Sequence, residues 1–355
     1  MVEELRRYRA DDLLRFVGDA LVKLGVAEDD ARLGAWALVH ADLMGVDSHG
    51  IMHFADGMGY VKGLRSGAVN AKAQPRVVRE TPAVALLDGD NGLGIVVASR
   101  AMQLAIEKAK SLGCGFVAVT NSRHFGMSAH YPLLAVEHDM IGLAMTNSLP
   151  SVAPTGGVER RLGTNPIAVA APAGQEPPFS LDIATSAVAY GKLELAQLRG
   201  ETIPEGWAID KEGNPTTDPY VFGQGGALLP LGSTPVLSSY KGYGLSLMVD
   251  IFSGVLSGLG SARMLSWDTW EMGHFLGAWR IDAFRPVEEF KAMMDETIRD
   301  LRATKPAPGA KGVLIPGEKE FYTERERRVR GIPLHPKVVA PLVKLGEELG
   351  LPFPA

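Results

Sequence analysis

The stretch DSHG at residues 47–50, followed by His53, decides how the rest of this sequence is interpreted. It places His49, whose ordinary pKa of ~6.5 lets it gain or lose a proton near neutral pH, beside a serine hydroxyl and a glycine. A second cluster, NSRHFG at residues 121–126, surrounds His124 with small polar residues and another glycine. Two histidines in such surroundings indicate chemistry at a site rather than packing in a core.

The segments on both sides of DSHG have the apolar period of helices. Residues 13–24 form one such segment, which Gly25 ends, and residues 28–45 form a second. Residues 51–65 predict a third helix. DSHG is therefore expected at a helix-to-helix junction, where side chains and helix-end amides can face a cleft.

After residue 74 the sequence changes to short β-rich segments separated by helical ones. Strands are expected at residues 76–78, 83–87, 115–120, 141–146, 167–171 and 179–182. Helices are expected at residues 95–112, 128–138, 185–198 and 242–256, and near the C-terminus at 286–303, 318–330 and 335–349. The residues between 200 and 239, rich in Gly, Pro, Thr and Asp, are expected to form a long ordered loop.

Helices at the two chain ends can pack against each other. We therefore expect an N-terminal helical part (1–75), an α/β body (76–284), and C-terminal helices (285–355) that pack with the N-terminal part.

Composition limits the class of protein. The 355 residues suffice for one large or two modest domains, and a hydrophobic content of 46% is typical of a soluble globular protein. A net charge of −5 gives no reason to expect nucleic acid as a partner. The N-terminus lacks the apolar stretch of a signal peptide, and residues 242–260 suit a buried helix better than a membrane span. Cys114, the only cysteine, forms no internal disulfide. We therefore expect a cytoplasmic protein without membrane contact.

Gly92-Leu93-Gly94, with Ala98, nearly matches the glycine pattern of a dinucleotide-binding turn. A Rossmann site also needs an acidic residue after the next strand, where it binds the ribose hydroxyls. That strand, at residues 115–120, is followed by asparagine and serine. We therefore favour an ordinary turn before a helix over a Rossmann site.

His49 and His53 are four positions apart, a spacing that would put both on one face of a helix. Such a pair suits a metal ion, but the glutamate of an HExxH motif is missing, and no metal site is expected. The other interpretations are a structural role at the helix end and acid–base catalysis. Acid–base catalysis is favoured because an imidazole exchanges a proton at working pH.

Small polar side chains recur where successive predicted strands end. They are TNS at residues 146–148, GTNP at 163–166 and DIATS at 182–186, in addition to the cluster around His124. Each alone is compatible with a turn, but together they predict one polar cleft. Exposed amides at the helix start after His124 are suited to an anion such as a cofactor phosphate.

Two glycine-containing segments open further helices. Lys241-Gly242 precedes an apolar helix, and a lysine at such a position can pair with a phosphate or a ribose. Gly317-Glu318 opens a C-terminal helix, where the carboxylate either satisfies the first amides of that helix or also contacts a ribose hydroxyl. The candidate cofactor-binding residues are Asn147, Ser148, Thr164, Asn165, Asp182, Ile183, Ala184, Thr185, Lys241, Gly242, Gly317 and Glu318.

The motifs follow one order along the chain: DSHGI, NSxHFG, TNS, LGTNPIA, DIATS, YKGYGLSLMVDIFSGVLSG and PGE. In this combination the chain, from about residue 13 to residue 349, resembles the malate/L-lactate dehydrogenase family of the second type. That family is unrelated to the Rossmann-fold lactate and malate dehydrogenases. It includes ureidoglycolate, sulfolactate and malate dehydrogenases, diketogulonate reductase, and reductases of the cyclic imines piperideine- and pyrroline-2-carboxylate.

The resemblance implies an α+β fold. A non-Rossmann domain with a largely antiparallel sheet would bind NAD or NADP, and a helical domain would be built from both chain ends. It also implies a homodimer, or a dimer of dimers, with active sites near the subunit interface. By position, His49 is the acid–base residue with Ser48 beside it, and His124 is similar to the proton-accepting histidine of ureidoglycolate dehydrogenases. The positions similar to those that contact the cofactor are Ser148, Asp182 to Ala184, Lys241 and Glu318.

The sequence departs from the family pattern where relatives hold the substrate. Many members have SHGVxRLxxY, whose arginine and tyrosine correspond by position to His53 and Gly57, and an upstream arginine corresponds to Met44. A guanidinium grips a carboxylate through two hydrogen bonds, which a neutral imidazole cannot do. Either Arg65 or Arg123 replaces it, or the substrate differs from a simple 2-hydroxy acid.

The expected activity is hydride transfer between nicotinamide and a small 2-hydroxy or 2-keto acid of the malate/lactate kind. His49 exchanges the accompanying proton, and Ser48 and His53 orient the substrate, which we expect to be a carboxylate. Three alternatives remain open: reduction of a cyclic imine, a metal-dependent hydrolase that uses His49 and His53, and a relative that binds ligands without turnover.

Overall fold

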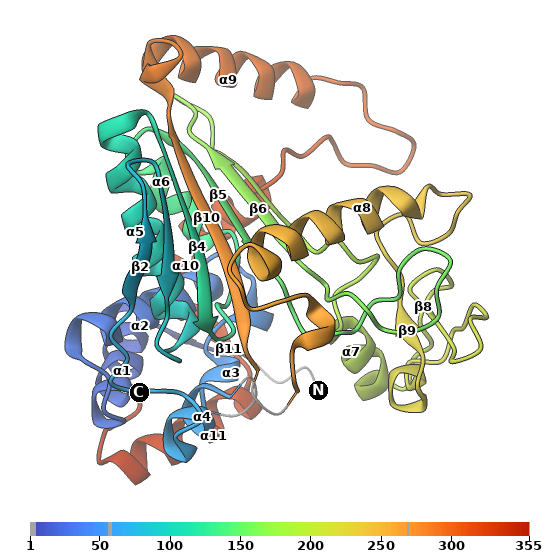
Figure 1. Ribbon diagram of the computed structural model, residues 1–355, viewed down its shortest axis with the longest axis horizontal. Helices are drawn as coiled ribbons and strands as arrows, with labels where there is room; N and C mark the ends of the chain where they lie inside the picture. The colour runs from blue at the N-terminus through green and yellow to red at the C-terminus, as the bar shows by residue number, and fades with distance from the viewer. Residues whose placement is uncertain (1–4, 56–58, 268–269, 355) are drawn as a thin grey trace.

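A seven-stranded sheet forms the centre of the computed structural model, which describes residues 5–55, 59–267 and 270–354 (Figure 1). The described strands are β1 (Arg6–Tyr8), β2 (Arg76–Glu80), β3 (Val84–Asp88), β4 (Cys114–Ser122), β5 (Met140–Thr146), β6 (Ile167–Ala171), β7 (Phe179–Ile183), β8 (Ala208–Ile209), β9 (Ala227–Leu228), β10 (Met272–Arg280) and β11 (Ile332–Leu334). The described α-helices are α1 (Ala10–Lys23), α2 (Glu28–Leu43), α3 (Met52–Ala55), α4 (Tyr60–Ser66), α5 (Gly94–Leu112), α6 (His130–Val136), α7 (Gly191–Arg199), α8 (Ser239–Asp250), α9 (Val287–Arg302), α10 (Glu318–Arg330) and α11 (Pro336–Leu349).

The central sheet has the strand order β2-β3-β4-β10-β5-β6-β7. β3 and β4 run parallel, and the other neighbouring strands of this sheet are antiparallel. Every strand expected between residues 76 and 182 is present, with ends that differ by one or two residues. A mixed, largely antiparallel sheet with helices agrees with the expected α+β class.

β10 is the central strand that the sequence did not predict. Its residues, MGHFLGAWR, contain two glycines and are buried for most of their length. Leu276 lies opposite Val117 of β4 on one side and Ala144 of β5 on the other. A strand that is covered on both faces needs no alternation of polar and apolar side chains, so periodicity gives no signal for it.

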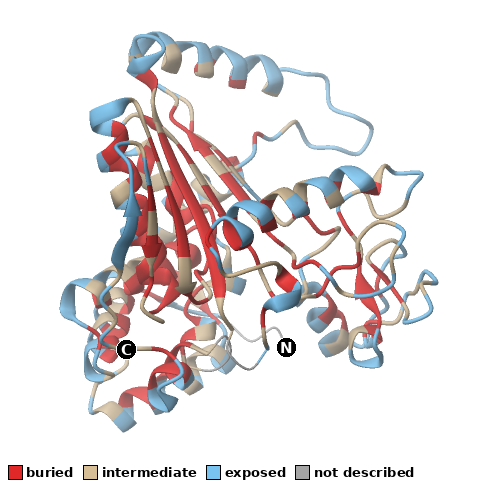
Figure 2. Ribbon diagram, viewed as in Figure 1, coloured by how far each residue is buried: buried red, intermediate tan, exposed pale blue. Residues whose placement is uncertain are grey.

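Helices cover both faces of the sheet, whose strands are largely buried between them (Figure 2). α5 and α6 pack on one face, where Met102 shares a buried cluster with Leu276. On the other face lie α8 and the π-helical turn that follows it, Ile251–Val255, and Val249 packs there against Phe275.

The two ends of the chain meet beside this sheet. β1 pairs with β11 in a small antiparallel sheet, with Tyr8 opposite Ile332. Leu13 of α1, Leu38 of α2 and Leu342 of α11 belong to one hydrophobic cluster. In Figure 1 the blue N-terminal helices accordingly lie beside the red helix α11. Residues from both chain ends thus pack together, while the division into three parts stays a prediction.

Two predicted helices differ from the structure. The helix expected at residues 51–65 is replaced by the separate helices α3 and α4, and residues 56–58 between them lie outside the described residues. The helix expected from Thr185 begins only at Gly191. The main chain of Thr185 and Ala187 is instead paired with other segments, because their N–H groups donate to the carbonyls of Thr164 and Leu229.

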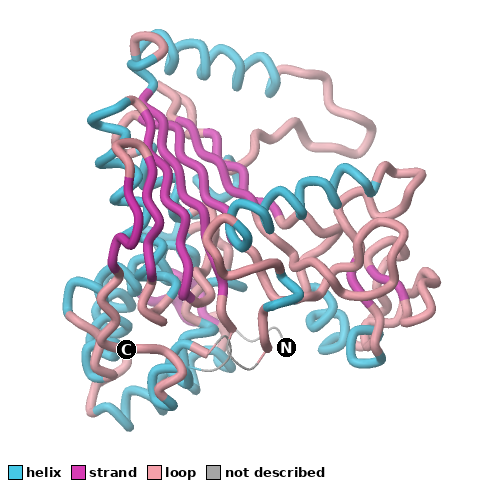
Figure 3. Tube along the Cα trace, in the orientation of Figure 1, coloured by secondary structure: helices cyan, strands magenta, loops and turns pink. Residues whose placement is uncertain are grey.

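The residues between α7 and α8 form the expected long loop, which contains the short β8–β9 pair (Figure 3). Ile203 and Val221 of this loop pack into a small hydrophobic cluster with Leu193 of α7. This packing holds the loop in one conformation. In the described part of the chain, no helix is long and apolar enough to cross a membrane.

Candidate active site

The four polar clusters predicted near strand ends gather at one edge of the central sheet. β4 and β5 both run antiparallel to β10, so both end where β10 begins. β7 has the same direction as β5, because both run antiparallel to β6, and it ends at the same edge. This edge therefore carries residues 121–126, 146–148 and 182–186, while residues 163–166 lead into β6.

His49 closes a short 3₁₀ turn, Asp47–His49, between α2 and α3. Its Nδ1 lies 3.0 Å from the Ser48 hydroxyl oxygen. Burial, and to a lesser extent the charge of His53, lower the pKa of His49 from 6.5 to about 4. The imidazole is therefore neutral at pH 7 and available to accept a proton.

The ring of His124 stacks on that of His49, with centroids 5.8 Å apart and 20° between the ring planes. Its Nδ1 accepts a hydrogen bond from the Gly126 N–H at 3.3 Å and lies 2.9 Å from the Tyr60 hydroxyl oxygen. Because Nδ1 is an acceptor, the proton of the neutral ring is on Nε2, and the Tyr60 hydroxyl donates to Nδ1. Burial holds the pKa of His124 well below its usual range. Two neutral imidazoles thus lie face to face.

Tyr60 is a site residue that the sequence analysis missed. It begins α4 and is buried, and burial raises its pKa. The resemblance predicted that the position of the family's tyrosine is held by Gly57, which lies outside the described residues. The tyrosine that contacts His124 comes three positions later. The sequence analysis did not consider Tyr60, because its contact with His124 depends on how α4 packs in the fold.

Gly94, at the start of α5, is a glycine because the chain around His124 packs closely against it. A Cβ on Gly94 would lie 1.9 Å from the Arg123 carbonyl oxygen and 2.4 Å from that of His124. Glycine is needed there, and its close approach sets α5 directly against the loop that carries His124. The interpretation of residues 92–94 as a turn before a helix agrees with the structure.

His53 lies on α3, a different element from the 3₁₀ turn of His49. Gly50 between them is extended, with φ −91° and ψ −154°. The expectation that both histidines share one helix face is therefore wrong. Burial lowers the pKa of His53, and a hydrogen bond with the Ser48 backbone partly offsets that effect. Among the residues that the structure describes, no group of three or more His, Cys, Asp or Glu side chains is arranged to hold a metal ion.

The Ser148 hydroxyl is the centre of a hydrogen-bond network beyond β5. It lies 3.1 Å from the Thr164 hydroxyl and accepts the Thr164 N–H at 2.9 Å. Asn165 Oδ1 accepts the Ser148 N–H at 3.0 Å. Thr185 in turn donates to the carbonyl groups of Thr164 and Asn165. Three of the polar clusters predicted at separate strand ends are thus one network, in which Ser148 and Thr164 are half-buried.

Asn147 and His274 join β10 to the same edge. Asn147 is buried, and its Oδ1 accepts the Gly273 N–H at 2.9 Å. The His274 ring bridges two neighbouring strands, with Nδ1 2.8 Å from the Thr146 hydroxyl and Nε2 2.9 Å from the Ser122 hydroxyl. Burial lowers the pKa of His274 to about 3. The sequence analysis missed this histidine because it missed the strand that carries it.

Several cofactor candidates lie outside this network. The Lys241 side chain is exposed in the first turn of α8, and Gly242 packs closely against the main chain of Leu231. The Asp182 carboxylate accepts the Ala129 N–H at 2.8 Å, which connects β7 to the segment before α6. Ile183 pairs with the first residue of β6, and Ala184 follows at the end of β7.

Glu318 opens α10 and is buried. Its Oε2 accepts the Ile315 N–H at 3.0 Å, and its Oε1 lies 3.0 Å from Arg302 Nη2. Gly317, with φ +87°, packs against Ser180. Of the two roles considered for Glu318, the structure contains the contact with a main-chain amide near the helix start, while a ribose contact stays a prediction.

The arginines considered as carboxylate partners are engaged in other contacts. Arg65 forms an ion pair with Glu348 at 2.7 Å. Arg123 is buried beside Glu271, with 3.6 Å between the charged groups. Met44, at the position where relatives have a further arginine, is buried in an apolar cluster.

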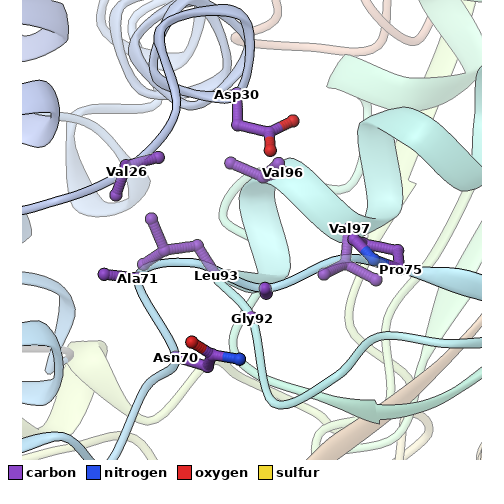
Figure 4. Close-up of a pocket in the computed structure, with 10 residues that line it drawn as sticks. Val26, Asp30, Asn70, Ala71, Pro75, Gly92, Leu93, Val96 and Val97 are labelled. Carbon is purple, nitrogen blue, oxygen red and sulfur yellow. The ribbon is translucent and has the colours of Figure 1, made fainter.

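A separate pocket lies between the α1–α2 junction and the start of α5 (Figure 4). It is lined by Val26, Asp30, Asn70, Ala71, Ala73, Pro75, Gly92, Leu93, Val96 and Val97. Its two polar side chains are already paired, because Asp30 binds Arg100 and Asn70 binds Asp90. The sheet edge is therefore the stronger candidate for an active site.

Known proteins resemble this chain over nearly its whole length. A family model described as malate/L-lactate dehydrogenase matches residues 8–343. A malate dehydrogenase from Pyrococcus horikoshii is 48% identical, over 98% of this chain and 97% of that protein. The solved structure of malate dehydrogenase from Entamoeba histolytica has a TM-score of 0.94 and 36% identity, covering 99% of this chain and 100% of that one. A delta1-piperideine-2-carboxylate reductase from Pseudomonas syringae has a TM-score of 0.85 and 29% identity, covering 96% of this chain and 99% of that one.

Proposed function

Because the chain belongs to the malate/L-lactate dehydrogenase family and is therefore an oxidoreductase, we propose that it transfers hydride between NAD or NADP and a small 2-hydroxy or 2-keto acid. The observation that carries this proposal is the stacked pair of His49 and His124 at a sheet edge rich in polar side chains. A site for proton exchange beside a site for a nicotinamide cofactor is what such a reaction requires.

His49 is proposed as the acid–base residue. In the oxidative direction its neutral imidazole accepts the proton of the substrate hydroxyl while the carbon loses hydride. In reduction the protonated ring returns that proton to the carbonyl oxygen. His124, with its own proton on Nε2, donates a hydrogen bond to the same oxygen and stabilises the charge that develops there. The nicotinamide, when bound, accepts or supplies the hydride.

Ser48 and His53 are proposed to orient the ring and the substrate. The Ser48 hydroxyl, 3.0 Å from His49 Nδ1, limits rotation of the imidazole. Since Arg65 and Arg123 are engaged in ion pairs, we assign His53 to orient the substrate, to which its neutral ring can donate one hydrogen bond in place of the two of a guanidinium. His53 is half-buried on the short helix that follows the His49 turn.

The cofactor is proposed to bind along the polar edge beyond β5. The half-buried hydroxyls of Ser148 and Thr164 are suited to amide and ribose groups, and the exposed Lys241 ammonium is suited to a phosphate. The rest of the proposed set comprises Asn147, Asn165, Asp182, Ile183, Ala184, Thr185, Gly242, Gly317 and Glu318. A sheet with one parallel pair among its neighbours supports a non-Rossmann mode of binding.

We further propose a homodimer in the cytoplasm. One side of α8 and the π-helical turn exposes Leu247, Ile251, Val255 and Leu256, by 41%, 48%, 57% and 56% of their surfaces. We call these four residues the α8 face. A contiguous apolar surface of this kind favours association with another protein surface. The single cysteine suits a reducing compartment.

A substrate screen that follows NADH and NADPH absorbance in parallel tests the proposed function. We expect turnover of at least one 2-keto acid, with a preference for one cofactor. Turnover of cyclic imines alone would favour the second candidate, imine reduction, which the likeness to the piperideine-2-carboxylate reductase supports. Cofactor binding without any turnover would indicate a relative that only binds ligands. Stoichiometric zinc or manganese without oxidation of either cofactor would favour the hydrolase alternative.

A further inference from the structure

We propose that Arg327, on the C-terminal helix α10, is a positioning residue for His49; this inference rests on the acid–base role proposed above. The Arg327 side chain is only 11% exposed. Its Nη1 donates to the Asp42 carbonyl at the end of α2 and to Asp47 Oδ1, and its Nη2 lies 3.4 Å from Asp47 Oδ2. One guanidinium thus ties the end of α2 to the first residue of the His49 turn.

α10 approaches this segment closely enough for that contact. Gly45 has φ +78°, and a Cβ there would lie 3.0 Å from Thr323 Cγ2, one helical turn before Arg327. A glycine at this position allows the left-handed backbone conformation and leaves room for α10. The C-terminal helix therefore packs directly on the loop that leads into the turn.

The other end of the turn is held from inside the protein. Asp42 Oδ2 accepts the Ile51 N–H at 2.8 Å. A Cβ on Gly50 would lie 2.1 Å from Asp42 Oδ1, so the backbone at that point rests on the buried carboxyl group. Asp47 is fixed by Arg327 and residues 50–51 by Asp42, and His49 lies between the two fixed points.

His49 has few restraints of its own. Its ring contacts the Ser48 hydroxyl and stacks on His124, but Asp47 and Ser48 are exposed. Without Arg327 the first half of the turn loses its charged partner. Misplacement of a reacting group by ~1 Å can lower a rate by about a hundredfold. The Ser148 hydrogen bonds go to Thr164 and Asn165, so this network should keep its geometry without Arg327.

The test compares Arg327→Met and Arg327→Lys with a matched control, Arg330→Met. Arg330 lies on the same helix, is 71% exposed and contacts Glu326 only at 3.9 Å. We expect Arg327→Met to lower kcat by at least about tenfold, while its Kd for the reduced cofactor, from fluorescence titration, changes less than about twofold. Arg327→Lys should recover part of kcat, because an ammonium can still pair with Asp47. Arg330→Met should behave like the wild type.

Hydrogen exchange measured by mass spectrometry separates this inference from the proposed function. The peptide that contains the His49 and Gly50 amides, which close the 3₁₀ turn, should exchange faster in Arg327→Met than in Arg330→Met. Unchanged exchange overturns the inference, and so does unchanged kcat or an equal loss of kcat and cofactor affinity. Full turnover of His49→Ala would instead overturn the acid–base role proposed for His49, and the exchange result would still decide whether Arg327 holds the turn.

Discussion

At the scale of single residues, the protonation of His49 determines what the site can do. Burial removes water that would stabilise the imidazolium ion, and the facing His124 is neutral as well. A ring with a pKa of about 4 is ready to accept a proton at every pH from weakly acidic to basic. It returns the proton readily, because its charged form is poorly stabilised.

Replacement of His49 by alanine should lower turnover at least about a hundredfold, because the proton then leaves without a positioned base. Cofactor affinity should stay nearly intact, since none of the proposed cofactor residues lies in the turn of residues 47–49. The control is His138→Ala, which removes an exposed histidine before β5 at the opposite edge of the sheet. Steady-state kinetics and cofactor titration measure both quantities. Unchanged turnover in His49→Ala would remove this residue from the mechanism.

The pH dependence of kcat/KM in the oxidative direction reports the pKa of the base in the free enzyme. The base works when neutral, so the rate should fall as pH falls through the pKa in the folded protein. Because that pKa is lowered from 6.5 to about 4, we expect the acidic limb of the kcat/KM profile near pH 4. At pH 6 kcat/KM should be nearly at its maximum. A limb near pH 6.5 would mean that the proton acceptor is not the buried His49.

The sequence predicted those site residues that lie in contiguous motifs. His49, Ser48 and His124 are of this kind. Tyr60 and Arg327 are not, because each reaches the site from a segment whose approach depends on the fold. The pairing of His49 with His53 on one helix face was wrong, since a spacing of four implies a shared face only when the helix is continuous.

At the scale of elements, Asp42 links α2 to the turn that follows it. Burial raises the pKa of its carboxyl group from 3.8 to about 8, although the Ile51 N–H and Arg327 oppose this shift. The carboxyl group therefore stays protonated in the folded protein at pH 7. In the unfolded chain it ionises above pH 3.8.

This difference makes stability depend on pH in a defined direction. Because the pKa of Asp42 is higher in the folded protein than in the unfolded chain, protonation of this group favours the folded state. Its contribution to stability is complete below about pH 4 and is lost as the pH rises to about 8. The loss amounts to at most ~1.4 kcal/mol per pH unit. Asp42→Asn keeps an acceptor for the Ile51 N–H but does not titrate. Urea unfolding at pH 5 and pH 8 should show a larger loss of unfolding free energy in the wild type than in the variant. Equal losses would contradict the shifted pKa.

The elements were predictable where local patterns decide them. Strands such as β6 and helices such as α5 follow from apolar runs and period. β10 could not be found in this way, because its two glycines and its burial on both faces are set by neighbours distant in the sequence. The delayed start of α7 has a similar origin, since the main chain of Thr185 pairs with a segment that periodicity does not reveal.

At the scale of the whole molecule, helices from both ends of the chain contact the segment that carries His49. α2 and α10 come from opposite ends of the chain, and both contribute to the support of the His49 turn, through Asp42 and Arg327. The strand ends supply the other half of the site. The proposed active site thus lies where the packed chain ends meet the sheet. The α8 face lies on the side of the sheet opposite α5 and α6.

The proposed dimer predicts that charge on the α8 face separates the subunits. Burial of an apolar side chain contributes ~1.5–3 kcal/mol, whereas an unpaired carboxylate in the same place opposes association. We expect Ile251→Glu combined with Val255→Glu to sediment as a monomer of about 38.0 kDa, and the wild type at twice that mass. The control is Leu198→Glu, a residue on α7 that is 82% exposed and outside this face. A wild-type monomer, or a variant with the mass of the wild type, would contradict dimerisation through the α8 face.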